Sequence, residues 1–149
     1  MEQTPWFLVW VAVAIALYHS YVQNPLEKRA LAAWFPDASW LPRPECPSCL
    51  GMPSGHAEVA ALLAVLLVVW ARVPAWVAVA AVATVAWERV AVQEHTWLQV
   101  GIGALLGTAY GVWYTSSGTE AGVKAMTSMA CVMALGVGLA GLSFFPQRV

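Results

Sequence analysis

The chain has 149 residues and a net charge of −1, with 60% hydrophobic residues, 10% charged residues and a mean hydropathy of +0.68. A composition this apolar excludes an ordinary soluble domain and is typical of an integral membrane protein. The few basic residues form no block or stripe, which excludes nucleic-acid binding and argues against a polybasic lipid-binding surface. The length suits one compact bundle, so we expect residues 1–149 to form a single membrane-embedded domain.

Hydropathy predicts an all-α bundle that crosses the membrane about five times. The expected spans are Pro5 to Val22, Ala57 to Ala71, Ala75 to about Val92, Leu98 to Tyr114, and Ala121 to Phe145. We expect the first span to be retained rather than cleaved as a signal peptide, because Glu2 precedes it and no basic side chain does. Tryptophans fall near the predicted span ends, as they do in the aromatic belts of membrane proteins.

The longest non-apolar segment, residues 23–52, separates the first two predicted spans. It contains too many prolines to form one helix. Within it, the sequence from Leu26 to Phe35 predicts a short amphipathic helix lying in the membrane interface, with Lys28 and Arg29 in water.

The fourth predicted span carries Gly103, Gly107 and Gly111 at four-residue spacing. This spacing places the three glycines on one face of a helix. We therefore expect that face to pack closely against a neighbouring helix.

Two polar clusters are predicted to lie on the same side of the membrane. Ser54 and His56 begin the second span, and the third span returns the chain to the side where Arg89 and His95 lie. Arg43, a few residues before the second span, belongs on that side as well. Ionisable side chains are costly near lipid, so their concentration at one end of a bundle indicates a functional site.

The residue types in these clusters favour phosphoryl transfer. Arginines such as Arg43 and Arg89 bind phosphate oxygens in a bidentate way and stay charged. Free amides at the start of a helix bind anions, and Gly55 allows an anion to approach the backbone. One histidine can attack phosphorus while a second protonates the departing oxygen. His95 and Gln99 are four residues apart, so the Gln99 side-chain oxygen can accept a hydrogen bond from one ring nitrogen.

Three short motifs carry a family resemblance. Arg43-Pro44, the "PSGH" of residues 53–56 and the "ERVAVQEHTWLQ" of residues 88–99 resemble the signature motifs of the type 2 phosphatidic acid phosphatase superfamily. That superfamily has the pattern Lys-x6-Arg-Pro, Pro-Ser-Gly-His and Ser-Arg-x5-His-x3-Asp. The chain is most similar to the dolichyl-diphosphatase branch, in which the last position carries glutamine, as Gln99 does here.

The resemblance implies a metal-independent hydrolase that needs no cofactor and works through a phosphohistidine. It implies a lipid phosphate or diphosphate substrate whose tail stays in the bilayer, and an active site on the lumenal or extracytoplasmic side. The implied catalytic residues are His95 as nucleophile, His56 as general acid and Gln99 as the partner that orients His95. The implied phosphate-binding residues are Arg43, Ser54, Gly55 and Arg89.

Two departures from the motifs keep a second function class open. Pro36 stands where the superfamily has lysine, and Glu88 stands where it has serine. Lys28 or Arg29 can replace the lysine if the amphipathic helix folds over the pocket. If neither does, the chain is a catalytically silent, phosphatase-like membrane protein with a structural or assembly role.

Other polar residues are expected to have structural roles or cannot be assigned a role from the sequence. Cys46 and Cys49 indicate either a local disulfide or half of a metal site, and the two histidines fit the phosphatase motifs better than a zinc site. His19 is expected to be structural. Glu58 and Glu94 remain unassigned, and the sequence does not predict the oligomeric state.

Overall fold

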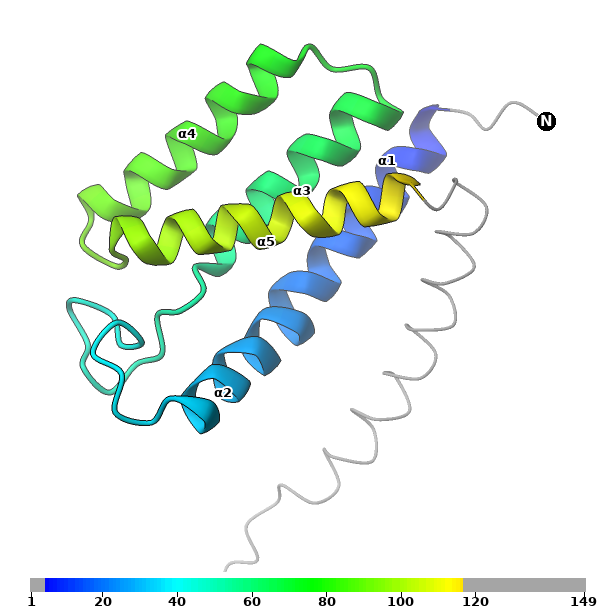
Figure 1. Cartoon of the computed structure of the whole chain (residues 1–149). Coiled ribbons are helices and arrows are strands. Elements are labelled where there is room, and N and C mark those ends of the chain that lie inside the picture. The colour runs from blue at the N-terminus through cyan, green and yellow to red at the C-terminus, as the bar shows by residue number, and fades with distance from the viewer. Residues whose placement is uncertain (1–4, 117–149) are drawn as a thin grey trace, which may run out of the picture.

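The computed structural model describes residues 5–116, and the regular elements in this range are all helices (Figure 1). They are α1 (Pro5–Tyr18), the π-helical turn η1 (His19–Gln23), α2 (Asn24–Trp34), α3 (Gly55–Trp70), α4 (Ala75–Ala91) and α5 (Trp97–Ser116). Because α1, η1 and α2 follow one another without a break, this part of the chain forms four helices. The predicted span from Ala121 to Phe145 lies outside the described residues.

The prediction of a separate helix from Leu26 to Phe35 is wrong. That segment is the last third of one continuous helix, Trp6–Trp34, which is 29 residues long. The sequence interpretation ended the first helix before Pro25, because proline lacks the N–H that an α-helix needs. The turn η1 removes this obstacle. The Asn24 N–H donates to the His19 carbonyl, and Pro25 then lies in the first turn of α2, where its missing N–H costs no helical hydrogen bond.

The helix Trp6–Trp34 is long and apolar enough to cross a membrane, and α3 is a shorter apolar helix. Within the described range no other helix meets the same test of length and hydropathy. The prediction of five spans is therefore not confirmed. The bounds predicted for the second, third and fourth helices agree with those of α3, α4 and α5 to within two residues.

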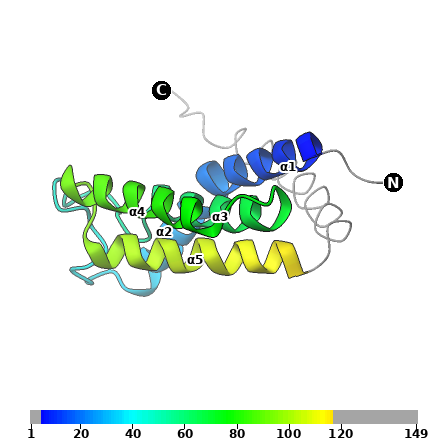
Figure 2. The ribbon, with the colours of Figure 1, turned by 90° about the horizontal axis from the view of Figure 1, so that it is seen from above.

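Helix α3 is the centre of the bundle and contacts α1, α4 and α5 (Figures 1 and 2). Its most extensive partner is α5. The core between α1, α3 and α5 is built from apolar side chains and one tyrosine: Ala12, Ile15, Leu62, Leu66 and Tyr114. These contacts hold α3 against the first helix and α5.

The predicted glycine face of α5 is confirmed. A Cβ atom on Gly107 would lie 1.9 Å from the backbone oxygen of Glu58, and one on Gly103 would lie 2.4 Å from the backbone oxygen of Ser54. No side chain fits at either position, so the backbones of α3 and α5 are in direct contact.

The segment between α2 and α3 folds into a compact loop beside the end of α4 and the start of α5 (Figure 1). Cys46 and Cys49 are joined by a disulfide, which decides between the two interpretations of this pair. Over residues 5–116 no group of three or more histidine, cysteine, aspartate or glutamate side chains could hold a metal ion. The Leu41 carbonyl accepts hydrogen bonds from Gly51 and Met52, which closes the loop on itself.

Candidate active site

A cavity of about 710 Å³ opens where α3 begins, between the first helix, the loop and the segment before α5. The basic side chains that line it are Lys28, Arg29, Arg43, His56 and His95. They come from four separate parts of the sequence and meet only in the folded chain. A cavity with this excess of cationic groups is suited to an anion that carries more than one negative charge.

The disulfide loop holds the backbone of Arg43. The Arg43 N–H donates to the Cys49 carbonyl at 2.9 Å, and the Arg43 carbonyl accepts from the Cys46 N–H at 3.3 Å. The Nε atom of Arg43 is buried, and within residues 5–116 it has no hydrogen-bond partner. Since buried donors in proteins are nearly always paired, an unpaired guanidinium nitrogen points to an acceptor supplied by a ligand.

Ser54 is another of the three side chains in the described range that have an unpaired buried atom, the third being Glu27. Its hydroxyl oxygen is completely buried at the N-cap of α3 and has no partner there. The Ser54 N–H donates to the Gln99 carbonyl at 3.1 Å, and the Ser54 carbonyl accepts from the Glu58 N–H at 3.0 Å. The backbone around Ser54 is therefore fixed on both sides, while its hydroxyl group is left without a partner in the described range. Ser54 itself is not among the residues that line the cavity.

His95 is buried between α4 and α5, and its Nδ1 atom lies 3.1 Å from Oε1 of Gln99. The Gln99 Nε2 group donates to the carbonyls of Trp40 and Pro42, at 3.0 and 2.7 Å. These two carbonyls accept only, so they require the amide nitrogen on their side and leave Oε1 to face His95. His95 must then carry its proton on Nδ1, and Nε2 keeps a free lone pair.

The environment of His95 favours the neutral ring. Burial lowers the pKa of His95, and the positive charges of Arg43 and Lys28 lower it further, while the hydrogen bond that His95 donates to Gln99 opposes them. A neutral imidazole with a free Nε2 is the form of histidine that acts as a nucleophile.

The last two residues of the "PSGH" segment differ in exposure. His56 is exposed at the rim of the cavity, whereas Gly55 is packed against Asn24. A Cβ atom on Gly55 would come within 2.8 Å of the Asn24 Oδ1 atom, so a glycine is needed here. The segment therefore presents its backbone and the His56 ring to the same cavity.

Arg89 is not among the described residues that line the cavity. Its guanidinium forms an ion pair with Glu88 and donates to Oε2 of Glu94 at 2.7 Å. It still lies within electrostatic reach of His56. Glu88, the residue that departs from the superfamily serine, thus contacts the neighbouring arginine and not the cavity itself.

Sequence reasoning missed Asn24, which is buried and lines the cavity. It also left Lys28 as an alternative, and the structure brings that side chain into the lining. A signal for Asn24 was present, because it is a polar residue within a predominantly apolar helix. The expectation of a helix break at Pro25 concealed it.

The family model of the PAP2 superfamily matches residues 7–123. No curated protein sequence matches the chain significantly, and neither does any solved structure.

Proposed function

The chain belongs to the PAP2 superfamily of phosphatases, and from this premise we propose that it is an integral-membrane lipid phosphatase or diphosphatase. The single observation that carries the proposal is the cavity that joins Arg43, Lys28, His56 and His95. The unpaired Arg43 Nε and Ser54 hydroxyl add two hydrogen-bonding groups suited to phosphate oxygens.

In the proposed mechanism, Nε2 of His95 attacks phosphorus and forms a nitrogen–phosphorus bond as the bond to the leaving oxygen breaks. His56 donates a proton to that oxygen. Water then attacks the phosphohistidine, His56 takes a proton from this water, and inorganic phosphate leaves with His95 restored. Arg43, Lys28 and the Ser54–Gly55 segment stabilise the charge on the transferred group.

The proposed role of Arg89 is less direct than that of Arg43. Because Glu88 and Glu94 occupy its guanidinium, Arg89 contributes positive charge near His56, and a direct phosphate contact requires that one of these pairs opens. No step in the mechanism uses a metal ion, because the arginines and the lysine supply the neutralising charge.

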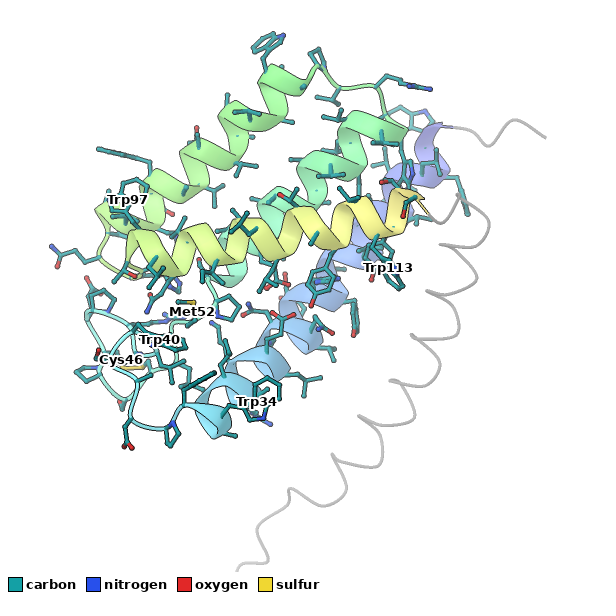
Figure 3. The ribbon with its side chains drawn as sticks, in the orientation of Figure 1. Trp34, Trp40, Cys46, Met52, Trp97 and Trp113 are labelled. Atoms are coloured by element: carbon teal, nitrogen blue, oxygen red, sulfur yellow. A yellow bond between two sulfur atoms is a disulfide. The ribbon has the colours of Figure 1, made fainter. Side chains whose placement is uncertain are left out.

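We propose a lipid substrate for two reasons. The cavity has an apolar wall on one side, to which Val59, Leu63 and Val85 contribute. Exposed tryptophans also mark both ends of the bundle, with Trp97 and Trp113 near opposite ends of α5 (Figure 3). Such aromatic side chains are typical of the two membrane interfaces. Together these features support a multi-pass bundle in which the lipid tail stays in the bilayer.

The finer assignments follow the motifs. Glutamine at position 99 favours a dolichyl-type, isoprenoid diphosphate over other lipid phosphates. The disulfide at Cys46 and Cys49 supports a lumenal or extracytoplasmic active site, because disulfides persist in oxidising compartments.

A second candidate function, a catalytically silent membrane component, is favoured by one observation. Glu88 and Glu94 neutralise Arg89, which weakens the positive field that an active site of this kind needs. In that case the cavity retains the shape of a phosphatase site without its turnover.

One experiment decides between the two. Purified protein in detergent, with EDTA present throughout, is given a polyprenyl diphosphate or phosphatidate, and phosphate release and acid-labile phosphoenzyme are measured. The proposal expects turnover and a trapped phosphoenzyme in the wild type, and neither in His95→Ala. The exposed Gln93→Ala variant is the control and should retain both. A wild type with neither signal establishes the silent alternative.

A further inference from the structure

A buried carboxylate, Glu58, joins the first turn of α3 to the first helix. Its Oε1 atom lies 2.9 Å from Nδ1 of His19, and its Oε2 atom accepts a hydrogen bond of 2.7 Å from Nδ2 of Asn24. All three side chains are almost completely excluded from solvent. Buried polar groups in an apolar bundle cost free energy unless each has a partner, and inside a membrane protein they indicate function.

The π-helical turn η1 explains why His19 and Asn24 reach the same carboxylate. In a regular α-helix, two residues five apart point about 140° away from each other around the axis. In η1 the Asn24 N–H donates to the His19 carbonyl five residues back, which widens the helix by one residue. Both donors then face Glu58. Single π-turns inside α-helices occur often at functional sites.

The same cluster contacts the segment Pro53–Gly55. Nδ2 of Asn24 is 3.4 Å from the Pro53 carbonyl oxygen, and Oδ1 of Asn24 occupies the space that a Cβ atom on Gly55 would need. The Glu58 N–H bonds to the Ser54 carbonyl. Because Glu58 accepts only, it requires Asn24 to present Nδ2 to it and Oδ1 to Gly55. The carboxylate thus sets the orientation of an amide that lines the cavity.

We propose that Glu58 and His19 are positioning residues, which act through Asn24 to hold the Pro53–Gly55 segment in the conformation that binds phosphate. This inference rests on the proposed function, because it takes that segment as the place where the substrate phosphate is received. Charge alone argues against a carboxylate close to an anion site. Its presence is explained by the geometry that it imposes on Asn24.

The test exploits the opposite signs of these two effects. Glu58→Gln is nearly isosteric and removes one negative charge, so electrostatics alone would tighten phosphate binding. If Glu58 positions the segment, the variant instead binds inorganic phosphate more weakly, by between about tenfold and a hundredfold. Affinity is measured in detergent from the rise of the thermal unfolding midpoint with phosphate concentration, and turnover of a lipid phosphate is measured in parallel.

The matched control is Glu27→Gln. Glu27 is a partly buried carboxylate on the first helix and lies within electrostatic reach of Glu58, but its hydrogen bonds are with Gln23 and Tyr110 and not with the phosphate segment. It should leave phosphate affinity unchanged or slightly tighter. A folded Glu58→Gln protein whose phosphate affinity equals or exceeds that of the wild type overturns the inference, even if its turnover is normal.

A second pair of variants decides the matter if Glu58→Gln does not fold. His19→Asn keeps a donor where Nδ1 stands and should retain phosphate affinity, whereas His19→Leu removes the donor and should lose it to the same extent as Glu58→Gln. Equal affinity in the two variants overturns the inference. A wild type that binds phosphate without turnover refutes the proposed hydrolysis but leaves the positioning test decisive, and a wild type that does not bind phosphate refutes both.

Discussion

Gly51 and Gln99 lie so close together that a Cβ atom on Gly51 would come within 2.8 Å of both terminal atoms of the Gln99 side chain. The loop that carries Arg43 therefore rests on the amide that orients His95. The Gln99 side chain therefore sets both the position of the loop and the tautomer of His95.

Gln99→Asp should impair the protein although aspartate is the commoner residue of the superfamily motif. Aspartate cannot donate to the carbonyls of Trp40 and Pro42, and each buried acceptor left without a partner costs about 1–3 kcal/mol. We expect a lower thermal midpoint and a loss of phosphate release. Gln93→Asp, at an exposed position, is the control and should change neither. Full activity of Gln99→Asp would show that the loop does not depend on this amide.

The pH profile should reflect the depressed pKa of His95. Only the neutral ring attacks phosphorus, so the acidic limb of kcat/KM should lie below pH 6.5, the ordinary histidine value. Lys28→Gln removes one of the charges that lower the pKa of His95, so protonation becomes easier and the limb should move to higher pH. Arg72→Gln, at the opposite end of α3, should leave it in place. A limb that stays fixed or moves to lower pH in Lys28→Gln contradicts the assignment.

Loss of the disulfide should weaken the site as well as the fold. The bond between Cys46 and Cys49 closes a loop with a sequence separation of three. Closing this loop lowers the conformational entropy of the unfolded chain and so stabilises the fold by about 2 kcal/mol. Because Arg43 is hydrogen-bonded to both cysteines, Cys46→Ser/Cys49→Ser should lower kcat/KM by about tenfold, equivalent to about 1.4 kcal/mol, mainly through KM. Reductant should reproduce this effect in the wild type and have no effect on the double variant. An unchanged KM would separate Arg43 from the loop.

Two glycines of α5 should respond in opposite ways to alanine. Gly107→Ala places a methyl group against the backbone of Glu58 and should destabilise the protein by at least about 1–3 kcal/mol. Gly101 has nothing within 4 Å of the corresponding position, so Gly101→Ala should stabilise the helix by about 0.5–1 kcal/mol. Thermal unfolding in detergent measures both. Equal midpoints for the two variants would contradict the close contact of α3 and α5.

The leaving group should determine how much His56 matters. Its proton assists departure of a basic alkoxide more than departure of a phosphate ester, which leaves readily without it. His56→Ala should therefore slow a lipid monophosphate by about 10²–10⁴-fold and a lipid diphosphate by less. The ratio of the two rates, each relative to wild type, is the measured quantity. Equal losses on both substrates would assign His56 to phosphate binding instead of acid catalysis.

Helix bounds and the gathering of the motifs were predictable because both depend on local signals. The apolar segments predicted α3, α4 and α5. Counting the predicted membrane crossings placed Arg43, His56 and His95 at one end of the bundle. The continuous first helix was not predictable, since a π-turn before Pro25 leaves no mark in hydropathy.

The partners of individual polar groups were predictable only within one helical turn. The contact between His95 and Gln99 follows from their spacing, and the structure contains it. The contacts of Glu58 with His19 and Asn24 join residues more than thirty positions apart, and they depend on how two helices pack. Hydropathy and motif spacing contain no information on that packing, so these residues could not be assigned from the sequence.

The direct backbone contact of α3 with α5 also limits how a substrate can enter. With no side chains between them at Gly103 and Gly107, these two helices cannot slide or separate without losing the contact, and they behave as one rigid body that carries Ser54 and Gln99 together. Any opening that admits a bulky lipid headgroup must then come from the other walls of the cavity. The first helix, which contributes Asn24 and Lys28 to the lining, supplies one of those walls, so the wall that must move and the helix pair that anchors the site are different parts of the bundle.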